Sequence, residues 1–179
     1  MKKLPIAFCI LSLGLVIFFA AACKKNDANP ATSQPTLYDS LGGTTMVQDP
    51  AAAPGTMIEK GRLLIRNIVD SSIFVIATDT AINGHFTVLL SEVTSGNLSG
   101  FQALSKNLTD FVAQGTGATH YSYTGKSMQA AHDPAQNPRM NQKADDDDMD
   151  AFEADLFAGA AKAGVPADNP ALISVGRIV

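Results

Sequence analysis

Apolar residues recur at helical spacing in several stretches of the chain and predict helices there. The clearest stretch is 98–114, which carries one apolar stripe made of Leu98, Phe101, Leu104, Leu108, Phe111 and Val112. Polar residues occupy the opposite face, and Gly115 follows the pattern as a natural helix end. This stretch therefore predicts an amphipathic helix with one buried face.

The other helical stretches are shorter or less uniform. A helix is predicted over 57–76, although its last residues, 73–76, are β-branched enough to form a strand instead. Further helical pieces are predicted at 37–41, 150–162 and 172–179. Regular strand alternation is absent elsewhere in the sequence, so the predicted fold class is all-α.

The first residues have the pattern of a targeting signal. Lys2 and Lys3 precede an almost wholly apolar run over 4–22, whose small last residues stand directly before Cys23. A small-residue run that ends in cysteine is the pattern at which bacterial lipoproteins are cleaved and lipidated, so Cys23 is the predicted lipidation site. An uncleaved membrane anchor is the alternative, because the run is long enough to span a bilayer. Either interpretation places the protein in the cell envelope, outside the cytoplasm and tethered to the cytoplasmic or the outer membrane.

The remainder divides into two parts. Residues 23–36 are polar and aperiodic, which predicts a flexible tether, and 37–179 are long enough to form one domain with a real core. Apolar residues make up 46% of the chain, too many for a disordered protein. Thirteen basic against seventeen acidic residues argue against nucleic-acid binding, and two cysteines are too few for a disulfide framework.

The acidic run 145–148 raises the question of calcium binding. A calcium loop of the EF-hand type that starts at Asp146 would need Gly at its sixth position and Glu at its twelfth. Ala151 and Phe157 stand there instead, so the pattern fails. The run is predicted to be a solvated acidic loop before a helix N-terminus, where negative charge is favourable.

The most informative stretch for chemistry is 123–132. Met128 and His132 are four residues apart, so on a helix they share a face. Such a pair can form one wall of a site for a flat apolar cofactor, with the imidazole coordinating the metal of that cofactor. Taken alone the pattern is weak, because a single histidine is more often an ordinary polar surface residue.

Five short strings together resemble the truncated haemoglobin family, group 1, whose members are 2-on-2 globins. They are Leu-Tyr-Asp-Ser-Leu-Gly-Gly at 37–43, Asp-Thr-Ala-Ile-Asn-Gly-His-Phe at 79–86, Leu-Thr-Asp-Phe at 108–111, Tyr-Thr-Gly-Lys-Ser-Met-Gln-Ala-Ala-His at 123–132 and Ala-Gly-Val-Pro at 163–166. They occur in the order that the family has. The resemblance implies a truncated globin fold over 37–179 and a bound haem.

The resemblance also implies a role for individual residues. His132 matches the axial ligand of the haem iron, and Phe86 matches the phenylalanine that stacks on the haem. Lys126 stands where a cation could pair with a haem propionate. The positions that match pocket-lining residues of the family are Phe111, Val112, Tyr123, Met128 and Phe152. The other histidines, His85 and His120, are expected to be exposed polar residues.

This chain departs from the family on the distal side, opposite the axial ligand. The family's tyrosine, which donates a hydrogen bond to bound oxygen, aligns with Ile73, or with Phe74 if the alignment slips by one, and neither can donate. The distal helix positions align with Leu104 and Leu108, so an apolar distal pocket is expected. Extra residues also lie between Phe86 and Phe101 and between His132 and Phe152.

The leading hypothesis is a haem protein that binds oxygen or another diatomic gas, such as NO or CO, and is not an enzyme. One alternative is a globin fold that has lost haem and serves as an interaction module. Another is a haem enzyme that acts on NO or peroxide. Peroxide cleavage needs an acid–base group on the distal side, and the sequence offers none there unless His85 turns inward.

Overall fold

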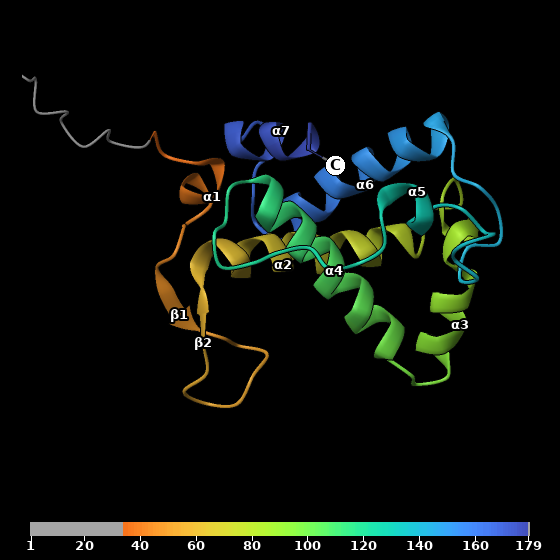
Figure 1. Ribbon diagram of the computed structural model, residues 1–179, viewed down its shortest axis with the longest axis horizontal. Coiled ribbons are helices and arrows are strands. Elements are labelled where there is room, and N and C mark those ends of the chain that lie inside the picture. Colours follow the sequence, from red (N-terminus) through yellow and green to blue (C-terminus); the bar gives the residue numbers. More distant parts are fainter. Residues whose placement is uncertain (1–33, 179) are drawn as a thin grey trace, which may run out of the picture. The chain divides into compact units, whose positions relative to one another are not determined.

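The computed structural model describes residues 34–178, and they form a mostly helical domain (Figure 1). Its elements in order are α1 (Leu37–Ser40), β1 (Met46–Gln48), β2 (Met57–Glu59), α2 (Lys60–Ile76), the 3-10 helix η1 (Asn83–Phe86), α3 (Thr87–Thr94), α4 (Ser99–Gly115), α5 (Met128–Ala131), α6 (Asp146–Lys162) and α7 (Pro170–Gly176). The predicted signal, Cys23 and most of the tether lie outside the described residues. Within 34–178, every helix is too short or too polar to cross a membrane.

The sequence did not predict the small hairpin of β1 and β2. The two strands are antiparallel, with Val47 opposite Ile58, and Gly55 takes a positive φ of 88° in the connecting loop. The expected helix over 57–76 therefore loses its first three residues to a strand, whereas 73–76 are helical. Strands of three residues are too short to show alternation in a sequence, which explains why they were missed.

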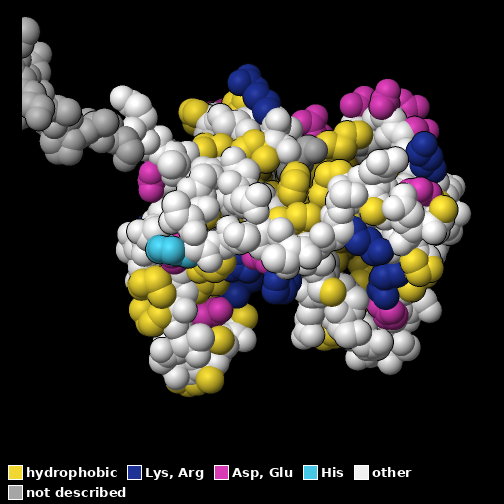
Figure 2. All heavy atoms as spheres, in the orientation of Figure 1, with side chains coloured by type: hydrophobic (Ala, Val, Ile, Leu, Met, Phe, Trp, Pro, Cys, Tyr) yellow, Lys and Arg dark blue, Asp and Glu magenta, His cyan; other side chains and the backbone are white. Residues whose placement is uncertain are grey.

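Helix α6 begins earlier than predicted. Asp145 is its N-cap and forms a capping box with Asp148, so the acidic run is the first turn of the helix and not a loop before it. The carboxylates there complement the positive end of the helix dipole. Figure 2 shows acidic side chains gathered over this end of α6. Helix α3, also unpredicted, occupies part of the extra segment after Phe86.

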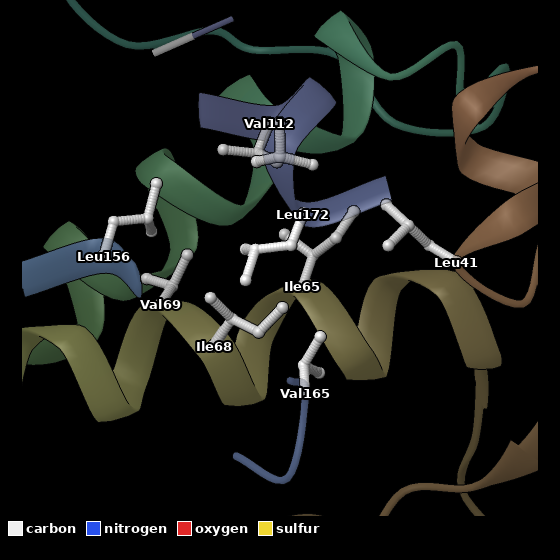
Figure 3. Close-up of a pocket in the computed structure, with 9 residues that line it drawn as sticks. Leu41, Ile65, Ile68, Val69, Val112, Leu156, Val165 and Leu172 are labelled. Atoms are coloured by element: carbon white, nitrogen blue, oxygen red, sulfur yellow. The ribbon is translucent and has the colours of Figure 1, made fainter. Parts of the chain in front are cut away.

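The core lies where α2 packs against α4, α6 and α7. Ile65, Ile68 and Val69 form the buried stripe of α2, and Figure 3 shows them beside Leu156 of α6 and Leu172 of α7. The residual void among these side chains is only about 10 Å³ and its walls are apolar. Because a single water needs at least about this volume and several polar partners, the core is dry and closely packed.

Helices α2 and α6 approach each other closely at one glycine. A Cβ atom on Gly159 would collide with the backbone and the hydroxyl group of Ser72. The Ser72 hydroxyl is instead satisfied within its own helix, where it donates to the Ile68 carbonyl over 2.8 Å. Because residue 159 has no side chain, α6 can lie this close to α2.

Candidate functional site

A cavity of about 950 Å³ lies on the other side of α4 and α6 from the packed core. Its walls come from η1 and α3, α4, the segment 123–126, α5, the segment 133–145 and the first half of α6. The volume is in the range of sites that hold cofactors or large ligands, which are mostly apolar with a few polar groups. The walls here have that character, with charged groups near the start of α6.

Nine of the residues singled out in the sequence line this cavity. They are Phe86, Leu104, Leu108, Phe111, Tyr123, Lys126, Met128, His132 and Phe152. They come from five separate segments between 86 and 152, so the fold gathers residues that the sequence had connected only through a resemblance.

Three further residues expected in this site lie elsewhere. Ile73 and Val112 are buried in the packed core, because the apolar stripe of α2 faces α6 and Val112 faces α2. Phe74 is 63% exposed and packs at the surface against Phe101, with ring centroids 5.6 Å apart. Helix α2 therefore contributes no side chain to the cavity wall, and the position aligned with the family's distal tyrosine is a core position.

His132 follows directly after α5 and is held in one orientation. Its Nδ1 atom lies 2.8 Å from the carbonyl oxygen of Met128. A carbonyl only accepts, so Nδ1 must carry the proton and donate it. In the neutral ring this leaves a lone pair on Nε2, which has no hydrogen-bond partner among residues 34–178. A histidine fixed through Nδ1 to a backbone carbonyl is the usual arrangement of a metal-ligating imidazole.

Local hydrogen bonds build the short helix that carries His132. Ser127 is the N-cap of α5, and its hydroxyl oxygen accepts from the amide of Ala130. Before it, the Tyr123 hydroxyl donates to the carbonyl of Lys126 over 2.6 Å. The string at 123–132 thus specifies a compact turn and helix start through its own side chains.

Aromatic and aliphatic side chains form much of the rest of the cavity wall. Phe111 of α4 meets Tyr123 edge to face, with ring centroids 5.6 Å apart and an interplanar angle of 79°. Leu104 and Leu108 lie on the same face of α4, and Phe152 comes from α6. Asn107 is the one polar side chain that α4 adds to the wall, and its amide has no hydrogen-bond partner within the described part of the chain.

The sequence predicted an exposed His85, and this prediction is wrong. The His85 side chain is 3% exposed and lines the cavity. The 3-10 turn of η1 directs its ring inward, where Nε2 lies 2.9 Å from a carboxylate oxygen of Asp148. The amide nitrogen of Gln142 is 3.1 Å from the same ring atom. The buried Nδ1 atom has no partner in residues 34–178. No local pattern marks this burial, because both partners lie more than fifty residues away in the sequence.

The charges around the cavity are of both signs. Lys126 and Arg139 line it together with Asp145, Asp146 and Asp148. The backbone N–H of Asp145 donates to Asp148 and, together with nearby His85, lowers the pKa of that carboxyl, which therefore stays ionised at neutral pH.

His120 is exposed, as expected, and stands outside the cavity. Its Nδ1 atom lies 2.5 Å from a carboxylate oxygen of Glu59, whose other oxygen accepts from the hydroxyl of Tyr38 over 2.7 Å. This cluster joins α1, the end of β2 and the segment after α4. It is a structural contact and offers no room for a cofactor.

The residues present fit a haem group. Haem needs one nitrogen ligand, an apolar slot and cations for its carboxylates. Here Nε2 of His132 is available, the cavity walls are largely apolar, and Lys126 lines the same cavity six residues before His132. Among the described residues, no cluster of three or more His, Cys, Asp or Glu side chains competes as a metal site.

Comparisons of the chain with protein families, with curated proteins and with solved structures found no match.

Proposed function

We propose that this protein binds haem through His132 and that, with haem bound, it takes up a diatomic gas, oxygen or otherwise NO or CO. The observation that carries the proposal is the His132 imidazole, held by Met128 with Nε2 available and set in a 950 Å³ cavity with apolar walls. When bound, haem supplies an iron that can take such a gas. The truncated globin fold belongs to the same proposal.

The chain's own residues have distinct tasks in this proposal. The Met128 carbonyl fixes the tautomer and orientation of His132. Leu104, Leu108 and Phe152 exclude water from the cavity. Lys126 can pair with a carboxylate of the ligand, since within residues 34–178 its hydrogen-bond partner is the neutral Gln136 carbonyl at 2.9 Å.

The proposal is tested by the visible absorption spectrum of the full chain after addition of haem. An intense Soret band shifted from that of free haem is expected. His132→Ala should abolish that shift or weaken haem binding strongly, and His120→Ala should leave it unchanged because His120 lies outside the cavity. Equal haem occupancy of the two variants would contradict the role of His132. Failure of the unmodified chain to bind haem would favour a haem-free interaction module.

We further propose that Cys23 carries a lipid anchor that tethers the domain to a membrane of the cell envelope. The support is the order of basic, apolar and small residues before Cys23 in the sequence. Cys23→Ser should release the protein from the membrane fraction or leave it unprocessed. A mature protein that still begins at Met1 in mass spectrometry would refute the anchor.

One observation favours a second candidate, a haem enzyme that acts on peroxide. His85 is buried at the cavity wall and paired with Asp148, an arrangement able to hold and pass on a proton. If this candidate holds, His85→Ala should lower peroxide turnover by at least about a hundredfold while the Soret band is retained. Equal turnover by this variant and the unmodified protein would remove the candidate.

A further inference from the structure

Residues 133–145 form one wall of the cavity and are called the cavity cover here. Asn137, Arg139, Met140 and Ala144 of the cover line the cavity. Both ends of the cover are attached to neighbouring structure. At its start the Asn137 amide donates to the Ala131 carbonyl over 2.7 Å, and at its end Asp145 caps α6. The cover is therefore held at both ends, and its middle passes over the cavity.

The middle of the cover is joined to α3 by an ion pair. Arg139 donates from both terminal nitrogens to the two carboxylate oxygens of Glu92, over 2.9 Å and 2.5 Å. This bidentate geometry is specific, because the planar guanidinium matches the carboxylate. The Arg139 side chain is 45% exposed and that of Glu92 is 23% exposed, so water competes for both groups. The pair can break and form again without leaving a buried charge unpaired.

A glycine of α4 leaves the space in which this ion pair sits. A Cβ atom on Gly100 would collide with a carboxylate oxygen of Glu92 and with a guanidinium nitrogen of Arg139. Gly100 has no positive φ, so its backbone does not require glycine. Glycine is unfavourable inside a helix, so helix formation does not explain Gly100. The space that the ion pair needs does explain it.

The second attachment of the cover is close to the other end of the cavity. The Gln142 amide nitrogen lies 3.1 Å from Nε2 of buried His85, and the same Nε2 lies 2.9 Å from an Asp148 carboxylate oxygen. Nε2 cannot donate to Asp148 and accept from Gln142 at the same time, so the Gln142 contact holds the cover only when Nε2 carries no proton. A third contact, in which the Lys126 ammonium donates to the Gln136 carbonyl over 2.9 Å, ties the cover to the segment before α5. Among the described residues, the Arg139–Glu92 pair is the ion pair that ties the cover to α3. Figure 1 shows the segment between α5 and α6 reaching across to α3.

We propose that the cavity cover opens and closes over the cavity, and that the Arg139–Glu92 pair seated on Gly100 is the clasp that holds it closed. With the clasp formed, as in this structure, the cover closes one side of the cavity, which stays partly open to solvent elsewhere. With the clasp broken, the middle of the cover moves away from α3, and small molecules can enter or leave the cavity. The clasp consists of residues of this chain alone, so it acts whatever the cavity binds.

The test uses hydrogen–deuterium exchange of the full chain without added haem, read on peptides from 133–145. Arg139→Ala and Glu92→Gln should each raise exchange in the cover about threefold to fivefold, the range expected for one partly exposed ion pair. Gly100→Ala should do the same although it removes no charge and improves helix propensity. The charge reversal E92R/R139E should return exchange toward the original rate.

A control is Lys106→Ala, which removes the ion pair between exposed Lys106 and buried Asp110 of α4, away from the cavity. This variant should leave exchange in the cover unchanged. The entry rate of an apolar fluorescent dye should follow the same order among the variants. The proposal is overturned if Gly100→Ala and Arg139→Ala leave exchange in the cover unchanged, or if Lys106→Ala raises it equally. A Soret band, or its absence, bears on the proposed function alone.

Discussion

The packed core and the cavity share two helices, α4 and α6, and both have largely apolar walls, yet the space open to water differs between them about a hundredfold. The core retains a void of about 10 Å³, while the cavity has about 950 Å³. Helix α4 gives Val112 to the core and Phe111 to the cavity, and α6 gives Leu156 to the core and Phe152 to the cavity. An apolar stripe therefore indicates only that a face avoids water. Whether it meets a tight partner or an unfilled space depends on the segment opposite it.

This difference predicts where shortened side chains are costly, and the largest effect is expected in the core. Leu156→Ala should lower the free energy of unfolding by about 2–5 kcal/mol, because its 1% exposed side chain has close neighbours on all sides. Phe152→Ala removes more atoms but should cost only about 1 kcal/mol in the absence of ligand, because the ring already borders an open space. Urea unfolding of the haem-free full chain measures both.

If Leu156→Ala and Phe152→Ala lowered the free energy of unfolding equally, the contrast between a packed core and an open cavity would be contradicted. Equal values would mean that the cavity collapses around Phe152 in solution. With haem bound, the cost of Phe152→Ala should rise, because the ring then loses a packing partner.

A tyrosine introduced at a core position and at a cavity position should separate the two regions by the size of its effect on stability. Ile73→Tyr should destabilise the fold by about 1–3 kcal/mol through overpacking, since Ile73 is buried in the core. Leu104→Tyr has room in the cavity and should leave stability nearly unchanged. In the haem-loaded protein it should slow oxygen release by up to about tenfold, as one added hydrogen bond would, with little effect on carbon monoxide.

Thermal unfolding and stopped-flow oxygen dissociation give these two readouts. Slower oxygen release in Ile73→Tyr than in Leu104→Tyr would show that α2, and not α4, faces the bound gas.

The last predicted effect, which depends on pH, concerns the edge of the core, where the hairpin is joined to α2 by an ion pair. The Arg66 guanidinium lowers the pKa of Asp49 from 3.8 to about 2. Because this pKa is lower in the folded state, the ionised carboxylate contributes stability above pH 4, and that contribution is lost as the pH falls toward 2. Its full size is about 2 kcal/mol.

Asp49→Asn should therefore remove this contribution at neutral pH and flatten the loss of stability between pH 4 and pH 2. Unfolding by urea at a series of pH values measures it. Asp150→Asn, which changes an exposed carboxylate of α6, should leave the pH profile as it is. A profile that Asp49→Asn does not alter would show that the hairpin is not held by this pair.

Much of the helical framework could be predicted from the sequence, because each helix is specified within its own stretch. The stripe at 98–114 corresponds to α4 at Ser99–Gly115, and the string at 123–132 contains the side chains that form the α5 start. The position of His132 four residues after Met128 was likewise visible in the sequence, and the Nδ1 hydrogen bond spans that same interval. Such features follow from local periodicity and local hydrogen bonds.

Only the tertiary structure decided which apolar faces border the core and which border the cavity. Val112 and Phe111 are adjacent in one stripe, and about 100° of rotation between them sends one to α2 and the other to an open space. The burial of His85 depends on Gln142, 57 residues away, and the clasp joins Glu92 to Arg139 across 47 residues. These contacts have no local signature because each partner is supplied by a distant segment, and only the folded chain brings the two together.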